Sequence, residues 1–177
     1  MTLPMTIRLA WQGAKIGFVF SQRGVVMEAA SSFFLPRLIG HSRALYLTTT
    51  GSTLPASSPH FGDLFHELLP SPQDVLPRAL ELAEQIVKQT STVSTYLMRE
   101  MMWRNPGSPE GAHLLDSELM WELYDKEDKK EGVKAFLEKR SPVMKGDLKG
   151  GMPGNVPWWQ GIDTRPKTGD RSAKSRL

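Results

Sequence analysis

The chain has 177 residues, of which 40% are hydrophobic and 23% charged, enough for one globular domain with its own core. It has no cysteine, which excludes disulfides, thiol catalysis and cysteine-bound zinc, and it has no apolar run long enough to span a membrane. The net charge of +3 comes from basic residues after Ser141 that are not interleaved with aromatic side chains, so nucleic-acid binding is not expected. The four histidines lack paired metal-ligand spacing, so no metal site is expected.

The first twenty residues predict two short strands, roughly Ile7–Ala10 and Lys15–Phe18, separated by a turn at Gln12-Gly13. The segment before the first strand lacks the basic, apolar and small regions of a signal peptide. Residues 21–27 are expected to form a loop.

Two short helices are expected next, over Glu28–Leu38 with an interruption at Pro36, and over Ser42–Thr49. Residues 52–59 are rich in Ser, Thr and Pro and predict a loop. A further short strand is expected within Phe61–Leu69, just before a proline.

From Pro77 onward the pattern is helical, with apolar residues at intervals of three and four. Helices are expected around Leu80–Val87 and Leu97–Met102, then over Pro109–Tyr124 and Glu127–Arg140. The apolar sides of the last two should face inward, and the methionines should pack in a core or an interface. The inward residues are expected to be Leu114, Leu115, Leu119 and Leu123 in the third helix and Val133, Phe136 and Leu137 in the fourth.

The glycine-rich and basic composition after residue 142 predicts a flexible tail, so the chain divides into a folded part, 1–142, and a tail, 143–177. The pair Trp158-Trp159 is the exception, because it could dock on the folded part. Two short strands do not make an independently stable sheet. We therefore interpret the chain as the helical half of a larger fold: a truncated product, a partial gene model, or a subunit that completes its fold with another chain.

Several sequence blocks follow one another in a distinctive order. They are Met5–Ala10, Ala14–Phe18, Arg23-Gly24, Leu35–Gly40 with Ser42–Leu45 after it, and Glu131–Arg140. In this order and spacing they resemble the C-terminal half of the enoyl-CoA hydratase/isomerase (crotonase) superfamily.

The resemblance implies an α/β, partial crotonase-like fold, with short strands at the N-terminus followed by a mostly α-helical region. It implies acyl-CoA thioester substrates and an enolate held by two backbone N–H groups in an oxyanion hole, with coenzyme A as part of the substrate and no resident cofactor. The segments that build this oxyanion hole would lie before Met1, so the upstream half of the domain is expected to be missing.

Glu28 is the candidate catalytic acid/base. It stands among small and apolar residues, a setting that favours the protonated carboxyl and suits proton transfer near neutral pH. It falls where the resembling Δ3,Δ2-enoyl-CoA isomerases, which include peroxisomal enzymes, place their sole catalytic glutamate. The alternative is structural, namely an acid in the first turn of a helix that interacts with the helix dipole.

Phe18 and Phe20 stand where the hydratases of the superfamily have polar residues, including one of two glutamates. The resemblance implies that they line an apolar substrate pocket beside Glu28. The first of the two hydratase glutamates would fall before Met1, so the two-carboxylate arrangement is absent from these residues. A Δ3 to Δ2 double-bond shift is therefore favoured over hydration. Hydration or dehydration of an acyl-CoA in peroxisomal secondary metabolism is the alternative reaction.

Phe136 and Lys139 match family residues that approach the adenine and phosphates of coenzyme A, often from a neighbouring subunit. The alternative is that Phe136 faces the core and Lys139 is a cation at a helix C-terminus. The resemblance also implies a homotrimer or hexamer. A different class of function remains open, in which the chain is a catalytically inactive partner of full-length relatives.

The chain ends in Ser175-Arg176-Leu177, which resembles the Ser-Lys-Leu signal read by the peroxisomal import receptor. A small residue, a base and a terminal leucine satisfy that pattern, and peroxisomes carry out acyl-CoA chemistry. We therefore expect a peroxisomal location. The alternative is an accidental tripeptide.

Overall fold

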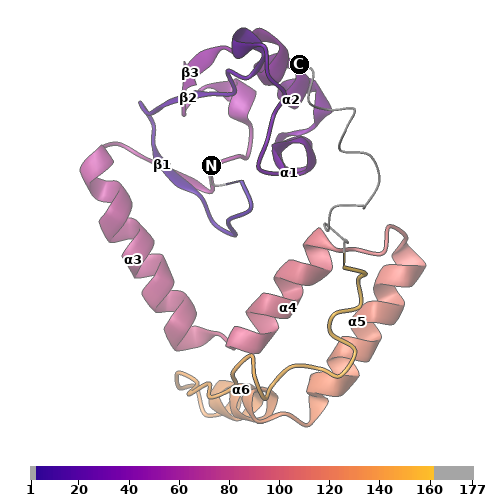
Figure 1. The fold of residues 1–177 in the computed structure, drawn as a ribbon. Helices are drawn as coiled ribbons and strands as arrows, with labels where there is room; N and C mark the ends of the chain where they lie inside the picture. The colour runs from indigo at the N-terminus through magenta and orange to yellow at the C-terminus, as the bar shows by residue number, and fades with distance from the viewer. Residues whose placement is uncertain (1–2, 162–177) are drawn as a thin grey trace. The chain divides into compact units, whose positions relative to one another are not determined.

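The computed structural model of the chain describes residues 3–161 and contains two compact units, Met1–Thr90 and Ser91–Leu177 (Figure 1). Each unit has its own hydrophobic cluster, and each is described below by itself. Among the described residues, no helix combines the length and apolar character needed to cross a membrane.

Short strands and helices make up the first unit. In chain order they are β1 (Leu9–Trp11), β2 (Lys15–Gly17), the 3-10 turn η1 (Ser21–Arg23), α1 (Ser31–Ile39), α2 (His41–Thr50), β3 (Thr53–Pro55), the 3-10 turn η2 (Pro59–Phe61), β4 (Glu67–Leu69) and α3 (Pro72–Gln89).

The strands form two separate two-stranded sheets. β1 pairs in parallel with β4, so that Leu9 lies opposite Glu67, and β2 pairs antiparallel with β3, so that Lys15 lies opposite Pro55. The two predicted N-terminal strands are therefore present but do not pair with each other. The loop predicted over residues 52–59 was wrong in part, because it contains β3.

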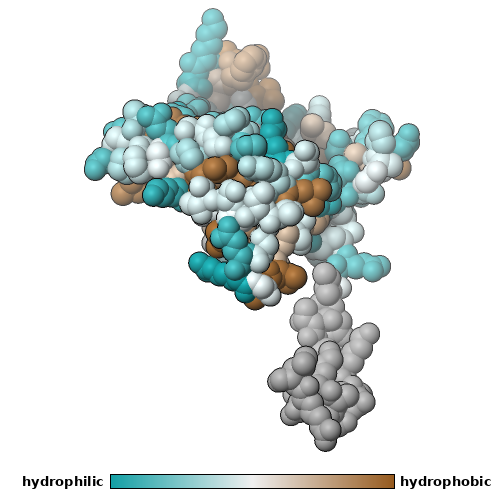
Figure 2. Space-filling view, turned by 90° about the horizontal axis from the view of Figure 1, so that it is seen from above, coloured by the Kyte–Doolittle hydropathy of each residue, from teal (hydrophilic) through white to brown (hydrophobic). Residues whose placement is uncertain are grey.

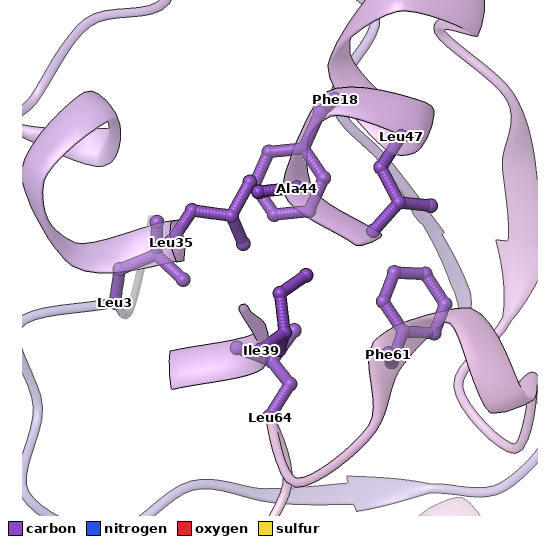
Figure 3. Packing of buried hydrophobic residues seen from close by; sticks show 8 residues of the cluster. All are labelled: Leu3, Phe18, Leu35, Ile39, Ala44, Leu47, Phe61 and Leu64. Carbon is purple, nitrogen blue, oxygen red and sulfur yellow. The ribbon is translucent and has the colours of Figure 1, made fainter. Parts of the chain in front are cut away.

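The core of the first unit lies between α1, α2 and the loops around them. Phe18 packs among side chains of both helices, and Phe61 and Leu64 follow from the loop before β4 (Figure 3). Leu35, Leu47 and Phe61 are completely buried. Pro36 lies inside α1, and the helix continues past it to Ile39, so the predicted interruption at this proline was wrong.

α3 begins earlier than the predicted start at Pro77. Ser71 caps it by accepting a hydrogen bond from the N–H of Gln73, and Pro72 occupies the first helical position, where its missing N–H costs nothing. Arg78 pairs with Glu67 of β4 at 2.9 Å. None of the eighteen residues of α3 is buried.

The second unit is a group of three helices, α4 (Thr92–Trp103), α5 (Pro109–Tyr124) and α6 (Glu127–Leu137). Its core contains Val93 and Leu97 of α4 and Leu119 of α5. The predicted docking of the tryptophan pair is confirmed for Trp158, which packs against this core and donates its indole N–H to the carbonyl oxygen of Arg104 at 3.2 Å.

Much of the predicted inward side of the last two helices is exposed. In α6, Val133, Phe136 and Leu137 are all exposed and Ala135 is the buried residue, so the predicted inward side was wrong. In α5, Leu119 is buried but Leu114 is exposed, and Met98 and Met102 of α4 are also exposed. Apolar side chains accordingly reach the surface beside hydrophilic ones (Figure 2).

Candidate active site around Glu28

Glu28 lies in the short irregular segment between η1 and α1 and is exposed. The helix predicted to begin at Glu28 begins instead at Ser31 and has no acidic residue in its first turn. The structural alternative for Glu28, an acid in the first helical turn, is therefore wrong. The dipole of α1 does not explain why an acidic residue stands at this position.

The backbone of Glu28 is fixed on both sides. Met27 packs its half-buried side chain against the core of the first unit. Ser31, which is completely buried, donates its hydroxyl to the carbonyl oxygen of Glu28 at 2.5 Å and its N–H to the same oxygen at 3.0 Å. The carboxylate therefore stands on an anchored backbone, as a general base requires.

Two consecutive alanines give the chain an unusual turn directly after Glu28. Ala29 and Ala30 have φ values of 51° and 55°, in the left-handed region that residues with a Cβ rarely adopt. Each such residue costs about 1–2 kcal/mol. Backbone strain of this kind concentrates at functional sites, where the surrounding contacts enforce it.

Glu28 is the only acidic residue among residues 1–62 of the sequence. Asp63, the next one, is exposed and lies in the loop before β4. Among residues 1–62, Glu28 is therefore the one carboxylate available for proton transfer.

Phe18 and Phe20, the predicted pocket residues, belong to the same unit as Glu28. Phe18 is 4% exposed and packs in the core, close to Ala44 and Leu35 in Figure 3. Phe20 is half-buried against the same cluster. Their lining of a substrate pocket stays a prediction.

Phe136 and Lys139, the predicted coenzyme A contacts, belong to the second unit and lie at the end of α6. The turn after this helix is a Schellman motif. The N–H of Lys139 donates to the carbonyl oxygen of Phe136, and the N–H of Arg140 donates to the carbonyl oxygen of Ala135. Lys139 takes the left-handed position, with a φ of 54°, where glycine is usual. Phe136 is 81% exposed, so the alternative that it faces the core is wrong.

A pocket of about 280 Å³ lies in the second unit, between the N-terminal ends of α4 and α6 and the loop 145–151. Asp128 lines it and accepts hydrogen bonds from the N–H groups of Lys145 and Gly146, both at 2.8 Å. Burial raises the pKa of Asp128, but hydrogen bonds from Ser91, Gly146 and Lys145 outweigh burial and hold this pKa below its usual value. None of the predicted site residues lines the pocket.

Residues 3–161 contain no group of three or more His, Cys, Asp or Glu side chains that could hold a metal ion. The predicted targeting signal, Ser175-Arg176-Leu177, lies outside the described residues. The role of Ser31 was missed by the sequence analysis. Its signal was a small polar residue three positions after the candidate base, the spacing at which a hydroxyl bonds back to a backbone carbonyl.

Comparison with known proteins gives a consistent result. Residues 1–147 match the family model of enoyl-CoA hydratase/isomerase. Two relatives from Alternaria alternata, enoyl-CoA hydratase AFT3-1 and enoyl-CoA hydratase ACTT3, are each 52% identical, over 84% and 80% of this chain and 50% and 48% of their own lengths. The chain thus spans about half the length of the curated relatives it matches.

A solved structure agrees with the sequence matches. A probable enoyl-CoA hydratase/isomerase from Mycobacterium abscessus superposes with a TM-score of 0.76 at 26% identity, over 82% of this chain and 59% of that one. The predicted partial crotonase-like α/β fold is confirmed by this likeness. The chain belongs to the enoyl-CoA hydratase/isomerase family of the crotonase superfamily.

Proposed function

We propose that the protein shifts the double bond of a 3-enoyl-CoA to the 2-position, with Glu28 as the single acid/base. The observation that carries this proposal is the lone carboxylate of residues 1–62, which stands on an anchored backbone directly before a strained turn. The substrate is a coenzyme A thioester, and no resident cofactor takes part.

The reaction needs one base because one proton moves. Glu28 removes a proton from C2, and the electrons pass into the thioester oxygen to give a dienolate. The protonated carboxyl then returns the proton to C4, which leaves the double bond between C2 and C3. Two N–H donors must stabilise the oxyanion, and each such donor contributes roughly 3–4 kcal/mol to the transition state.

Phe18 and Phe20 support this chemistry through their apolar character. An apolar wall excludes water, which suppresses hydration of the conjugated product and strengthens the hold on the oxyanion. Phe136 and Lys139 are proposed to contact the adenine and a phosphate of coenzyme A. Their exposure at the end of α6 leaves an aromatic face and a cation accessible to such a ligand.

Hydration of a 2-enoyl-CoA is the second candidate, favoured by the names of the Alternaria relatives. The product distinguishes the two. When the protein is given a 3-enoyl-CoA, isomerisation yields the conjugated 2-enoyl thioester, which is detected by its ultraviolet absorbance. A hydratase does not act on the unconjugated double bond of a 3-enoyl-CoA. No conversion of that substrate, together with formation of a 3-hydroxyacyl-CoA from a 2-enoyl-CoA as identified by mass spectrometry, would therefore replace the isomerase proposal with hydration.

Two carboxylate variants test the base. Glu28→Gln removes the base and should abolish the isomerisation, by at least about a thousandfold. Asp63→Asn removes another exposed carboxylate of the same unit and should leave the rate unchanged. If the chain neither binds nor converts an enoyl-CoA, the enzyme proposal fails and an inactive partner of full-length relatives takes its place.

We also propose that the protein is imported into peroxisomes through Ser175-Arg176-Leu177. The support is the similarity of this terminal tripeptide to Ser-Lys-Leu. Acyl-CoA isomerisation, in fatty acid or secondary metabolism, would suit that compartment.

A further inference from the structure

α6 has little apolar packing of its own. Of the eleven described residues of α6, Ala135 alone is buried, and three apolar residues of the helix are exposed. Most helices in proteins are stabilised by packing of an apolar side rather than by intrinsic propensity. Contacts of another kind are therefore needed to hold α6 in the second unit.

The chain that follows α6 supplies such contacts. Glu131 accepts a hydrogen bond from the N–H of Val143 at 2.8 Å. Asp128, three residues before Glu131, accepts hydrogen bonds from the N–H groups of Lys145 and Gly146, both at 2.8 Å. Residues three apart lie on the same side of a helix, and hydrogen bonds to a carboxylate are stronger than those between neutral groups. The segment 143–159 is thus attached at its start to one side of α6.

The same segment is attached at its other end to α4 and α5. It runs from α6 back toward the end of α4, where the indole N–H of Trp158 donates to the carbonyl oxygen of Arg104 at 3.2 Å (Figure 1). The Arg104 guanidinium lies 4.1 Å from the ring centre of Trp159. Met152, Val156 and Trp158 pack against the apolar cluster that α4 and α5 share. The segment therefore joins α6 to the other two helices.

Two glycines of the segment allow this close approach. A Cβ atom on Gly146 would lie 2.5 Å from Oδ2 of Asp128, and one on Gly151 would lie 2.7 Å from Cγ2 of Val93 and 2.7 Å from a backbone carbonyl oxygen. These distances are too short for atoms in contact. Gly154 has open space where its Cβ would be. The segment thus comes closest to the helices at positions where the sequence has no side chain.

We propose that residues 143–159 form a strap that fixes α6 to α4 and α5, and that α6 keeps its place in the second unit only while the strap is attached. Most of the strap lies beyond residue 147, where the match to the family model ends. α6 also carries Phe136 and Lys139, so a strap that fixes α6 fixes these two proposed coenzyme A contacts. The strap itself does not depend on that role or on the role of Glu28.

Three glycine-to-alanine variants of the full chain test the strap by hydrogen exchange. Gly146→Ala and Gly151→Ala place a methyl group against Asp128 and Val93 and should detach the strap. The backbone amides of α6 should then exchange at least about tenfold faster than in the original chain. Gly154→Ala adds the same methyl group in open space and should exchange like the original chain. The amides of α1 and α2, in the first unit, are the internal reference and should not change.

A variant of the other end shows whether the strap acts as one element. Trp158→Ala removes the attachment to α4 and α5 and should also speed exchange in α6 at least about tenfold. In the double variant of Gly146→Ala and Trp158→Ala, the acceleration should be much smaller than the product of the two single accelerations, because either change alone already detaches the strap.

Four results would overturn the proposal. The first is unchanged exchange in α6 when Gly151→Ala or Trp158→Ala is introduced, which would show that α6 is held without the strap. The second is an acceleration in the double variant that equals the product of the single ones, which would make the two ends separate local contacts. The third is an equal acceleration in Gly154→Ala, and the fourth is faster exchange in α1 and α2, since the strap contacts lie in the second unit. Exchange is the readout, so these results are separate from any failure of isomerase activity.

Discussion

Ser31 donates both its hydroxyl and its backbone N–H to the carbonyl oxygen of Glu28, over 2.5 and 3.0 Å, while its own side chain is completely buried. The contact reaches Glu28 through the backbone and leaves the carboxylate exposed. Ser31 is thus a positioning residue for the candidate base. This relationship gives the first prediction.

Replacing Ser31 by alanine should lower the free energy of unfolding by about 1 kcal/mol, because a buried hydrogen bond to the Glu28 carbonyl is lost. Ser32→Ala, which removes an exposed hydroxyl one position later, should change it by less than about half that amount. Urea unfolding of the two variants measures the difference. Equal stabilities would contradict the anchoring role of Ser31.

The left-handed turn after Glu28 gives a second prediction. Ala30 is exposed and has a φ of 55°, so a β-branched side chain there meets backbone strain without any loss of packing. Ala30→Val should destabilise the protein by about 1–2 kcal/mol. Ala30→Gly should be neutral or slightly stabilising, because relief of strain offsets the added freedom of the unfolded chain. A higher melting temperature for Ala30→Val than for Ala30→Gly would contradict backbone strain at this turn.

The helices could be predicted from the sequence because their signals are local. The periodic apolar residues indicate all six helices, and the predicted bounds of α1, α2, α5 and α6 lie within three residues of the observed ones. The main error of position, at α3, had a visible signal in Ser71-Pro72, a cap followed by a proline at the first helical position. The residues around Glu28 were predicted as a functional site. The start of α1 was placed three residues early, because the two left-handed alanines before it leave no pattern in the sequence.

The strand pairing and the covered faces could not be predicted in this way. β1 pairs with β4 across more than fifty residues, and every strand has three residues, too few for alternation to show. β3 contains Thr53 and Pro55, which are typical of a loop as well as of an edge strand. In α6, periodicity identified Val133, Phe136 and Leu137 as one apolar side but carried no information on whether anything covers it.

Glu100 gives a third prediction. Glu100 is 4% exposed, and its carboxylate pairs with Nη1 of Arg99 and with Nε of Arg104, each at 2.6 Å. The Arg104 guanidinium also lies 4.1 Å from the ring centre of Trp159. Glu100→Gln removes the charge and should destabilise the second unit by about 1.5–3 kcal/mol. Glu118→Gln, at an exposed position of α5, is the control and should have little effect. Four of the five tryptophans belong to this unit, so tryptophan fluorescence follows mainly its unfolding. Coincident curves for the two variants would contradict the prediction.

The pair of Glu131 and Arg140 gives a fourth prediction, on pH. Hydrogen bonds from the Arg140 side chain, at 2.6 and 3.0 Å, and from the N–H of Val143 lower the pKa of Glu131 from 4.5 to about 2. A carboxyl whose pKa is lower in the folded state stabilises the protein fully above its unfolded pKa. That stabilisation is lost as the pH falls through the folded value. The contribution of this pair should therefore be constant above about pH 4.5 and decline from there to about pH 2.

Carbon NMR of the Glu131 carboxyl measures this directly, with a midpoint expected near pH 2. Arg140→Gln should move the midpoint upward toward the ordinary value, because a neutral side chain then replaces the cation that donates hydrogen bonds to Glu131. Lys134→Gln, which removes a nearby cation that forms no hydrogen bond with Glu131, should move it much less. A Glu131 midpoint near pH 4.5 in the original chain would show that the ion pair of Glu131 and Arg140 does not stabilise the turn after α6, which contains Lys139.

The terminal tripeptide gives the last prediction, for a segment outside the described residues. An import receptor that reads the extreme C-terminus requires the exact last residues, so a fluorescent protein fused ahead of Met1 should collect in peroxisomes in fungal cells. Removal of Ser175–Leu177 should disperse the signal, and so should a single glycine added after Leu177, which keeps all three residues but moves them from the end. Arg176→Lys creates the Ser-Lys-Leu sequence itself and should retain import. A dispersed signal from the Arg176→Lys fusion would show that this end of the chain is not presented to the receptor, and a punctate signal after the deletion would show that another segment directs the protein.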